Sequence, residues 1–389
     1  MSIRIVMYSH DAVGLGHIRR NLALAHALTT GLGDVTGMLV AGRPEATRFA
    51  VPRGWDWLIL PGMAHADDGY ASRALDIDVD AAAAVRGGAF RSAVRAFRPD
   101  LVVIDRHPLG VGGELERALR TLRAEHPECR VVLGLRDVLD APGATAREWR
   151  AIGGPAAMRE FFDAIWVYGD PNVHDLAADG ELPAGVSDLV SHTGLLADGR
   201  VAGAAHDIEE PFVLTTVGGG SDGAELAVAA AGAEVPRGYR HLVITGPQMA
   251  AADRRAVQGA AREGTTVVRR VPDALPLMQR AAAVVCMGGY NTICEVLSTA
   301  TPALVAPRMQ RRAEQRIRAA ALERVGAVET LLPWRIDADT IGAWFGRSVG
   351  TRVERESLAL DGLARVPQLA ADLLGVAAGA AAGGERVAV

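Results

Sequence analysis

Short apolar runs alternate with helical patterns along most of this chain, and the alternation limits its possible folds more than any other feature. The runs read IRIVMYS, VTGMLVA, WLIL, DLVVID, RVVLGL and AIWVYG, then FVLTTVGGG, HLVITG, TTVVRRV, AAVVCMGG and PALVAP. Strands this apolar are buried on both faces, as in a parallel sheet covered by helices. The sequence therefore predicts an α/β fold with doubly wound parallel sheets.

The two series of runs are separated by a stretch without periodicity, which we interpret as a linker. The chain has 389 residues, of which 49% are hydrophobic, and this is enough for two cores. We expect a Rossmann-like domain over 1–195, a linker over 196–210, a second such domain over 211–374, and a flexible tail over 375–389. The last helix can pack back on the first domain. Two such domains would face a central cleft.

Composition excludes several classes of protein. The net charge is -5 and no long basic arm is present, which argues against a nucleic-acid partner. No apolar window is long enough for a membrane span, and the first residues lack a signal-peptide pattern, so we expect a cytoplasmic protein. The three cysteines are too scattered for a disulfide framework or a zinc site, and we expect them to be buried apolar residues; they are Cys129, Cys286 and Cys294.

A run of arginines before DLVVID raises the question of peripheral membrane contact. Large apolar neighbours are few, so the pattern favours a solvated helix face over a membrane-binding one. Contact with a membrane surface stays open as an alternative. The arginines are Arg86, Arg91, Arg95 and Arg98.

The first glycine loop, in MYSHDAVGLGHIRR, follows the first predicted strand. Gly14 and Gly16 form a turn, and a helix with an apolar face begins close to His17. Backbone N–H groups and the positive end of a helix dipole favour an anion at such a place. The alternative is a glycine turn made for tight packing, with His17 on the surface.

The second loop, TTVGGGSDGAE, contains G-x-G-x-x-G at Gly218, Gly220 and Gly223. A nicotinamide-binding unit would carry an acidic residue at the end of the next strand, but that strand ends in Thr245 and Gly246. A dehydrogenase is therefore disfavoured. A phosphate-binding role for the loop, with a hydroxyl from Ser221, is kept.

The third loop, CMGGYNTICEVL, offers two interpretations of Glu295. Asn291 and Thr292 are good N-cap residues, and Glu295 lies three residues after Thr292, which is the spacing of a capping box. A carboxylate in the first turn of a helix can also accept hydrogen bonds from the two adjacent hydroxyls of a ribose.

At these residues the sequence resembles the glycosyltransferases of the GT-B fold, in the group like the peptidoglycan N-acetylglucosaminyltransferase, which carries a family 28 C-terminal domain. The resemblance rests on G-G-Y-N-T-x-x-E at 288–295, PALVAP at 302–307, Glu314 with Gln315, and a helix that ends at Gly326. The segments YSHDAVGLGHIRR, IDRHPLGVGGEL and GLRDVLDAP are similar to a bacterial branch of predicted glycosyltransferases in that superfamily.

The resemblance implies a site for a nucleoside diphosphate sugar, with uracil as the expected base and no resident cofactor. Glu295 would bind the ribose, Glu314 and Gln315 the sugar, and the backbone at Arg270 and Val271 the base. The diphosphate would be lined by Gly16, Gly219, Gly220, Ser221, Gly288, Gly289, Asn291 and Thr292. The chain departs from the family in its less glycine-rich first loop and in Arg308 and Met309 after PALVAP.

Inverting sugar transfer needs a base for the acceptor hydroxyl, and a neutral imidazole suits this task. We predict His17 as the base, oriented by Asp105, which closes the strand DLVVID. Asp105 could instead pair with Arg106 or cap the following segment, and His10 and His107 are rival bases. Acceptor-side residues are expected at His10, His65, Asp67, Asp68 and His107.

A D-x-D pattern at Asp76 and Asp78 is a metal site in transferases of another fold, but helix dipoles replace the metal in the GT-B fold, so no metal is predicted. The sequence thus predicts a metal-independent, inverting hexosyltransferase that moves a sugar from UDP to a hydroxyl or amine of a small-molecule acceptor in natural-product biosynthesis. Two alternatives are a nucleotide-sugar epimerase and a non-catalytic partner protein that binds nucleotide sugars. The oligomeric state is left open.

Overall fold

The computed structural model describes residues 2–10, 14–66, 69–203, 208–308 and 313–378. The chain divides into two compact units. Of the described residues, unit 1 comprises those up to Pro171, Asp175–Gly199 and those from Asp361 onward, and unit 2 comprises Asn172–His174 and Arg200–Leu360. Each unit has its own parallel sheet and its own buried core.

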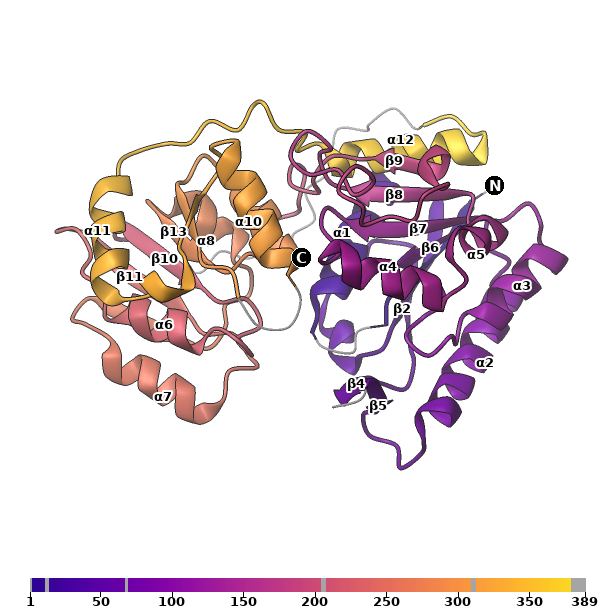
Figure 1. Ribbon diagram of the computed structural model, residues 1–389, viewed down its shortest axis with the longest axis horizontal. Helices are drawn as coiled ribbons and strands as arrows, with labels where there is room; N and C mark the ends of the chain where they lie inside the picture. Colours follow the sequence, from indigo (N-terminus) through magenta and orange to yellow (C-terminus); the bar gives the residue numbers. More distant parts are fainter. Residues whose placement is uncertain (1, 11–13, 67–68, 204–207, 309–312, 379–389) are drawn as a thin grey trace. The chain divides into compact units, whose positions relative to one another are not determined.

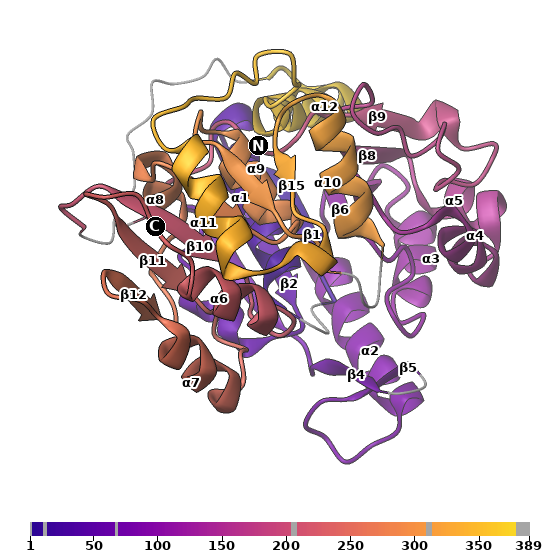
Figure 2. The same ribbon diagram turned by 60° about the vertical axis from the view of Figure 1, so that its left-hand side comes forward.

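Unit 1 is built on a seven-stranded sheet in the order β3-β2-β1-β6-β7-β8-β9, with every neighbouring pair parallel. The strands are β1 (Ile3–Tyr8), β2 (Val35–Ala41), β3 (Trp55–Ile59), β6 (Leu101–Asp105), β7 (Arg130–Arg136), β8 (Ala164–Tyr168) and β9 (Val190–His192). Its helices are α1 (Gly16–Leu32), η1 (Pro44–Arg48), α2 (Val79–Phe97), α3 (Glu116–Glu125), α4 (Pro142–Ala151), α5 (Gly154–Phe161), η2 (Ser187–Leu189) and α12 (Gly362–Leu374). Figures 1 and 2 both show α2 and α3 lying side by side.

Unit 2 is built on a six-stranded sheet in the order β12-β11-β10-β13-β14-β15, again parallel throughout. The strands are β10 (Phe212–Thr216), β11 (Arg240–Ile244), β12 (Thr265–Val268), β13 (Val284–Cys286), β14 (Ala303–Val305) and β15 (Glu329–Thr330). The helices are α6 (Ala224–Ala231), α7 (Ala251–Ala260), α8 (Leu275–Arg280), α9 (Tyr290–Leu297), α10 (Glu314–Arg324), η3 (Pro333–Arg335) and α11 (Ala338–Ser348).

The strand order confirms the predicted doubly wound α/β fold in both units. Numbered within each unit, the first six parallel strands of each sheet follow the Rossmann order 3-2-1-4-5-6. The direction of strand addition reverses between β1 and β6 in unit 1 and between β10 and β13 in unit 2. Ligands of such sheets bind outside the carboxyl ends of the strands at this reversal. The three glycine loops found in the sequence follow β1, β10 and β13.

The last helix, α12, is far from unit 1 in sequence but belongs to it. It packs on α1 so closely that a Cβ at Gly31 would overlap the ring of Pro367. The chain enters α12 through a β-bridge between Leu196 and Asp361. Of the predicted tail, residues 379–389 lie outside the described part of the chain.

A small antiparallel hairpin, β4 (Met63–Ala66) and β5 (Gly69–Ser72), was not predicted. It lies beside α2, as Figure 2 shows. Its strands are too short for a period-2 pattern to be recognised. The hairpin carries His65 and Tyr70, whose rings stack with centroids 4.6 Å apart.

The arginine run on α2 is not one solvated face, and this part of the prediction is wrong. Arg86 is fully buried and pairs with Glu114, whereas Arg95 is exposed and pairs with Glu125. Asp78, in the D-x-D pattern, caps α2 by accepting a hydrogen bond from the N–H of Ala81.

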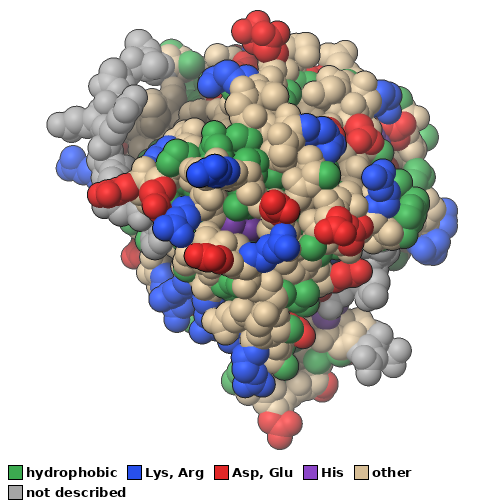
Figure 3. Space-filling view, turned by 90° about the vertical axis from the view of Figure 1, so that its left-hand side faces the viewer, with side chains coloured by type: hydrophobic (Ala, Val, Ile, Leu, Met, Phe, Trp, Pro, Cys, Tyr) green, Lys and Arg blue, Asp and Glu red, His purple; other side chains and the backbone are tan. Residues whose placement is uncertain are grey.

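The three cysteines are buried, as predicted. Within the described residues, no helix combines the length and the apolar character needed to cross a membrane. On the face drawn in Figure 3, acidic and basic side chains are intermixed.

One buried polar side chain on α1 gives a stability prediction. Asn21 is 2% exposed, and neither of its side-chain polar atoms has a hydrogen-bond partner among the described residues. An unsatisfied buried polar group costs about 1–3 kcal/mol. We expect Asn21→Leu to raise the free energy of unfolding, measured by urea denaturation. A lower value for the variant would show that the amide is satisfied in solution.

His241 gives a pH-dependent prediction for unit 2. Burial lowers its pKa to about 3, while the unfolded chain binds the proton near the ordinary value. Below about pH 6.5 the unfolded state therefore holds one proton more, and stability falls by about 1.4 kcal/mol per pH unit. Urea unfolding from pH 7 to pH 4 should show this loss in the wild type but not in His241→Gln, which cannot take up that proton. Equal slopes would contradict the prediction.

Candidate functional site

The carboxyl ends of β1 and β6 bring His17 and Asp105 together, although they are 88 residues apart. His17 lies in the first turn of α1, and Asp105 is the last residue of β6. The Nδ1 atom of His17 lies 2.7 Å from Oδ2 of Asp105, and Arg106 pairs instead with Glu148. Asp105 is 1% exposed and His17 is half-buried, so the carboxylate is shielded while the imidazole is reachable from solvent.

Arg20 is a third member of this cluster. It lies one turn after His17 on α1, and its Nη2 donates to both carboxylate oxygens of Asp105 at 2.7 and 2.6 Å. Burial opposes the charge of Asp105, but Arg20 and His17 outweigh it and hold the pKa of the carboxyl well below its usual range. Asp105 is therefore an anion at neutral pH. In the tautomer that carries its proton on Nδ1, His17 donates to Asp105 and Nε2 is the basic atom.

Two more histidines of the prediction lie in this cluster. The ring centroid of His10 lies 4.7 Å from that of His17 and 4.6 Å from that of His107. Tyr70, on the hairpin, contributes a ring 6.4 Å from His10 and also stacks on His65. Burial, and then the charge of His17, lower the pKa of His10 well below its ordinary value, so His10 is neutral. Asp67 and Asp68 lie outside the described residues.

In unit 2, the loop after β10 has the backbone of a tight turn. Gly218 and Gly220 have φ of 61° and 89°, values that favour glycine. A Cβ at Gly220 would overlap the carbonyl oxygen of Thr245. Gly219 and Ser221 are exposed on this loop, which leads into α6 through Gly223. The glycines give this part of the loop no side chains of its own, and the side chain of Gln248 lies beside it, 2.7 Å from where a Cβ at Gly219 would be.

The loop after β13 differs from one detail of the prediction. Gly289 caps α9, the helix begins at Tyr290, and no side-chain cap is formed. Thr292 is therefore the third helical residue, and the capping-box interpretation of Glu295 is wrong. A Cβ at Gly289 would meet no atom within 4 Å, so the backbone there is open. Arg318 donates to the carbonyl oxygen of Gly288 at 2.7 Å and fixes this loop.

Glu295 is 1% exposed and faces a residue that the sequence analysis did not identify. Nη1 of Arg200, between the two sheets in sequence, lies 3.8 Å from Oε1 of Glu295, and Nη2 donates to Oδ1 of Asn291 at 3.3 Å. Three residues later, the N–H of Gly203 donates to Asp273 at 2.6 Å. The segment that begins at Arg200 therefore contacts Asn291 and Glu295 of the predicted nucleotide site.

Glu314 and Gln315 open α10, and both contact Arg308. Arg308 donates to Glu314 at 2.5 Å and to Asp222 of the second glycine loop at 3.1 Å, and its backbone N–H donates to Gln315 at 3.1 Å. The departure from the family at Arg308 thus joins two parts of the predicted donor site. Met309 lies outside the described residues.

The remaining residues predicted for the donor site, Gly16, Arg270 and Val271, also lie in segments that follow the carboxyl ends of strands. Gly16 is the exposed first residue of α1. Arg270 is exposed and Val271 half-buried in the segment between β12 and α8, where Leu275 and Met278 are buried. Among the described residues, no group of three or more His, Cys, Asp or Glu side chains could hold a metal ion.

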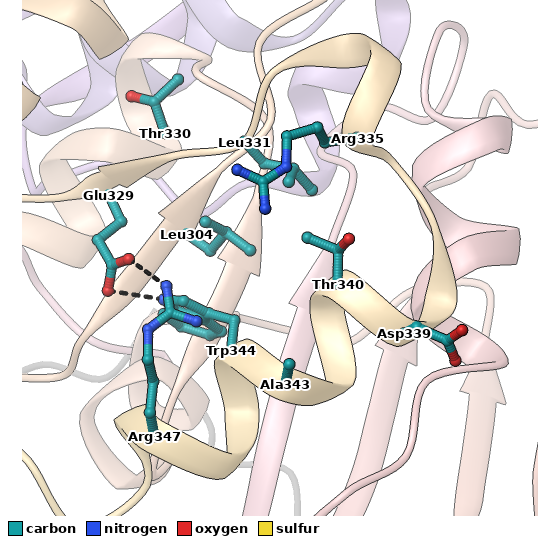
Figure 4. A pocket seen from close by; sticks show the side chains of 10 residues that line it. All are labelled: Leu304, Glu329, Thr330, Leu331, Arg335, Asp339, Thr340, Ala343, Trp344 and Arg347. Carbon is teal, nitrogen blue, oxygen red and sulfur yellow. Dashed lines mark hydrogen bonds and ion pairs between the residues drawn. The ribbon is translucent and has the colours of Figure 1, made fainter.

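A cavity of about 410 Å³ lies elsewhere in unit 2, beside β14, β15 and α11 (Figure 4). An ion pair between Glu329 and Arg347 closes one side of it. No residue predicted for the donor, acceptor or catalytic roles lines this cavity.

Sequence reasoning missed Arg20, Arg200 and Arg318, which hold the predicted residues in place. Arg20 had a usable signal, because it lies three residues after His17 and therefore on the same face of the helix. The partners of Arg200 and Arg318 are 30 or more residues away along the chain, with no local pattern to indicate them.

Comparison with known proteins shows what the fold and the second unit resemble. Residues 214–341 match the glycosyltransferase family 28 C-terminal domain. No curated protein matches the chain in sequence. Among solved structures, the glycosyltransferase of kitacinnamycin is 17% identical with a TM-score of 0.62, covering 96% of this chain and 98% of that one.

Two further structures extend the likeness. MurG of Acinetobacter baumannii is 15% identical with a TM-score of 0.56, covering 96% of this chain and 99% of that one. VinC, solved in complex with dTDP, is 14% identical with a TM-score of 0.60, covering 96% and 99%. The chain thus has the GT-B fold of these glycosyltransferases, and residues 214–341 of its second unit match the glycosyltransferase family 28 C-terminal domain.

Proposed function

We propose that the protein is a metal-independent, inverting glycosyltransferase that moves a hexose from a nucleoside diphosphate, with UDP as the first candidate, to a hydroxyl or amine of a small-molecule acceptor. The observation that carries the proposal is the 2.7 Å contact between His17 and a buried, ionised Asp105 at the strand reversal of unit 1. The family 28 match over residues 214–341 supports a nucleotide-sugar donor in unit 2.

In the proposed reaction, Nε2 of His17 takes the proton of the acceptor hydroxyl while the oxygen attacks the anomeric carbon. The bond from that carbon to the diphosphate breaks on the opposite face, so the configuration inverts. The proton stays on the imidazole, and Asp105 stabilises the imidazolium through Nδ1–H.

The donor is held by unit 2 in this proposal. Glu295 accepts hydrogen bonds from the ribose, and the backbone at Arg270 and Val271 contacts the base. N–H groups of the loops around Gly219 and Gly289 receive the diphosphate at the N-terminal ends of α6 and α9. These dipoles stabilise the leaving diphosphate in place of a metal ion. Glu314 and Gln315 contact the sugar.

The acceptor side is proposed at the ring cluster of unit 1. The rings of His10 and His107 are proposed to contact the acceptor through their polar atoms. His65, on the hairpin, is exposed and is proposed to contact the acceptor through its ring face. The protein is proposed to act in the cytoplasm, where nucleotide sugars are available. Natural-product acceptors are the first class to test.

The test is turnover of a panel of UDP- and dTDP-linked hexoses, read as release of free nucleoside diphosphate with and without candidate acceptors. Transfer predicts acceptor-dependent release, and an α-linked donor should give a β-linked product. An epimerase would instead convert the sugar with the nucleotide still attached. A non-catalytic partner would bind the nucleotide and release nothing, and either of these outcomes would contradict the proposal.

A further inference from the structure

One buried ion pair in unit 1 joins three segments that carry the ring cluster of His10, His17, Tyr70 and His107. Arg86, on α2, is 0% exposed. Its Nη2 donates to the hydroxyl of Tyr8 at 2.6 Å, and its Nε donates to Glu114 at 3.2 Å. Its Nη1 donates to the carbonyl oxygen of Pro61 at 2.6 Å. The guanidinium therefore uses all three of its nitrogen atoms.

Each partner of Arg86 stands next to a different part of the cluster. Tyr8 ends β1, two residues before His10. Pro61 precedes the hairpin that carries Tyr70, and Glu114 ends the loop that begins at His107. The Tyr8 hydroxyl also donates to Glu114 at 2.6 Å, and Glu114 accepts the N–H of Gly112 at 2.8 Å. One guanidinium thus fixes all three segments to α2.

The surrounding backbone leaves room for this pair and little else. A Cβ at Gly42 would lie 3.2 Å from Nη1 of Arg86 and would overlap the carbonyl oxygen of His10. A Cβ at Gly110, where φ is 81°, would overlap the carboxylate of Glu114. Burial and the charge of Glu114 raise the pKa of Tyr8 well above its usual range, so its hydroxyl remains a donor.

We infer that Arg86 is a positioning residue for the sugar-transfer site, because it sets the relative places of His10, His107 and the hairpin without touching the reacting atoms. The inference rests on the proposed function. A lysine at this position would keep the positive charge but could not reach the three partners, because the three N–H donors of an ammonium share one nitrogen atom.

The test compares Arg86→Lys with Arg123→Lys in the full chain. Arg123 is a matched control in the same unit, because it also pairs with a carboxylate, Asp163, and donates to a backbone carbonyl oxygen, that of Phe161. We expect Arg86→Lys to move the imidazole NMR signals of His10 and His107 at pH 7 and to lower kcat by about 10- to 100-fold. The dissociation constant for UDP should stay within about twofold of wild type, because UDP binds unit 2. Arg123→Lys should change none of these quantities.

Wild-type NMR signals and wild-type turnover in a folded Arg86→Lys variant would overturn the inference. If that variant does not fold, Tyr8→Phe replaces it, since it removes a single hydroxyl, and unchanged His10 and His107 signals would again overturn the inference. If wild-type protein turns over no nucleotide sugar, the proposed function fails, whereas moved histidine signals in Arg86→Lys still support the positioning role.

Discussion

Replacing His17 with alanine is expected to lower kcat for sugar transfer by about 10²- to 10⁴-fold, the usual contribution of a positioned general base. The reason is that Nε2 of His17 is the atom proposed to take the acceptor proton, with Nδ1 held by Asp105. Donor binding should change little, because Glu295 and the loops around Gly219 and Gly289, which are proposed to hold the donor, belong to unit 2. Initial rates of nucleotide release with saturating acceptor, together with calorimetric titration of UDP, measure both quantities.

His26→Gln is the control for this variant, since His26 lies on the same helix, α1, outside the cluster. It should retain wild-type kcat. A His17→Ala variant with wild-type kcat and normal stability would show that another group is the base, and His10 and His107 would then be tested in the same way. Loss of UDP binding in His17→Ala would contradict the division of roles between the two units.

Replacing Glu295 with glutamine is expected to weaken UDP binding by about 10- to 100-fold, because a hydrogen bond to a charged group contributes about 1.5–3 kcal/mol. Glu295 is buried, so water has little access to the carboxylate and cannot easily replace its hydrogen bonds to the ligand. The sharper test compares ligands. dTDP lacks the ribose 2′-hydroxyl, so the Glu295→Gln substitution should weaken dTDP binding by a smaller factor than it weakens UDP binding.

Glu234→Gln serves as the control, because Glu234 is in unit 2 but its side chain is 85% exposed and lies 3.8 Å from Arg262. Its UDP affinity should equal that of the wild type. Equal factors for UDP and dTDP in Glu295→Gln would contradict a contact between Glu295 and the 2′-hydroxyl. Wild-type UDP affinity in that variant would remove Glu295 from the donor site.

Much of the fold could be predicted because strands buried on both faces leave long apolar runs. The run 35–41 coincides with β2, and the run starting at Ile3 gives β1. Strands β9 and β15, of three and two residues, lie outside these apolar runs and were missed. The place of α12 beside α1 also depends on long-range packing around Gly31 and Pro367, which no local pattern records.

The proximity of His17 and Asp105 was predictable for a topological reason. Asp105 ends β6, His17 lies in the helix that follows β1, and the strand order places β1 next to β6. The roles of charged residues were harder to predict, because a buried ion pair depends on a distant partner. Arg86 was misinterpreted as part of a solvated face because Glu114 is 28 residues away. The capping-box interpretation of Glu295 failed because the sequence does not show that α9 begins at Tyr290.

The most direct test of the account is the thermal midpoint of the purified protein with UDP, dTDP, GDP, ADP and NAD. A ligand that binds only the folded state at one hundred times its dissociation constant stabilises that state by about 2.7 kcal/mol. The account predicts that UDP or dTDP raises the thermal midpoint and that NAD does not change it. The base of the nucleotide that raises the midpoint directs the choice of donor sugars. No shift with any nucleoside diphosphate, or a shift with NAD alone, would contradict the assignment of unit 2 as the donor site.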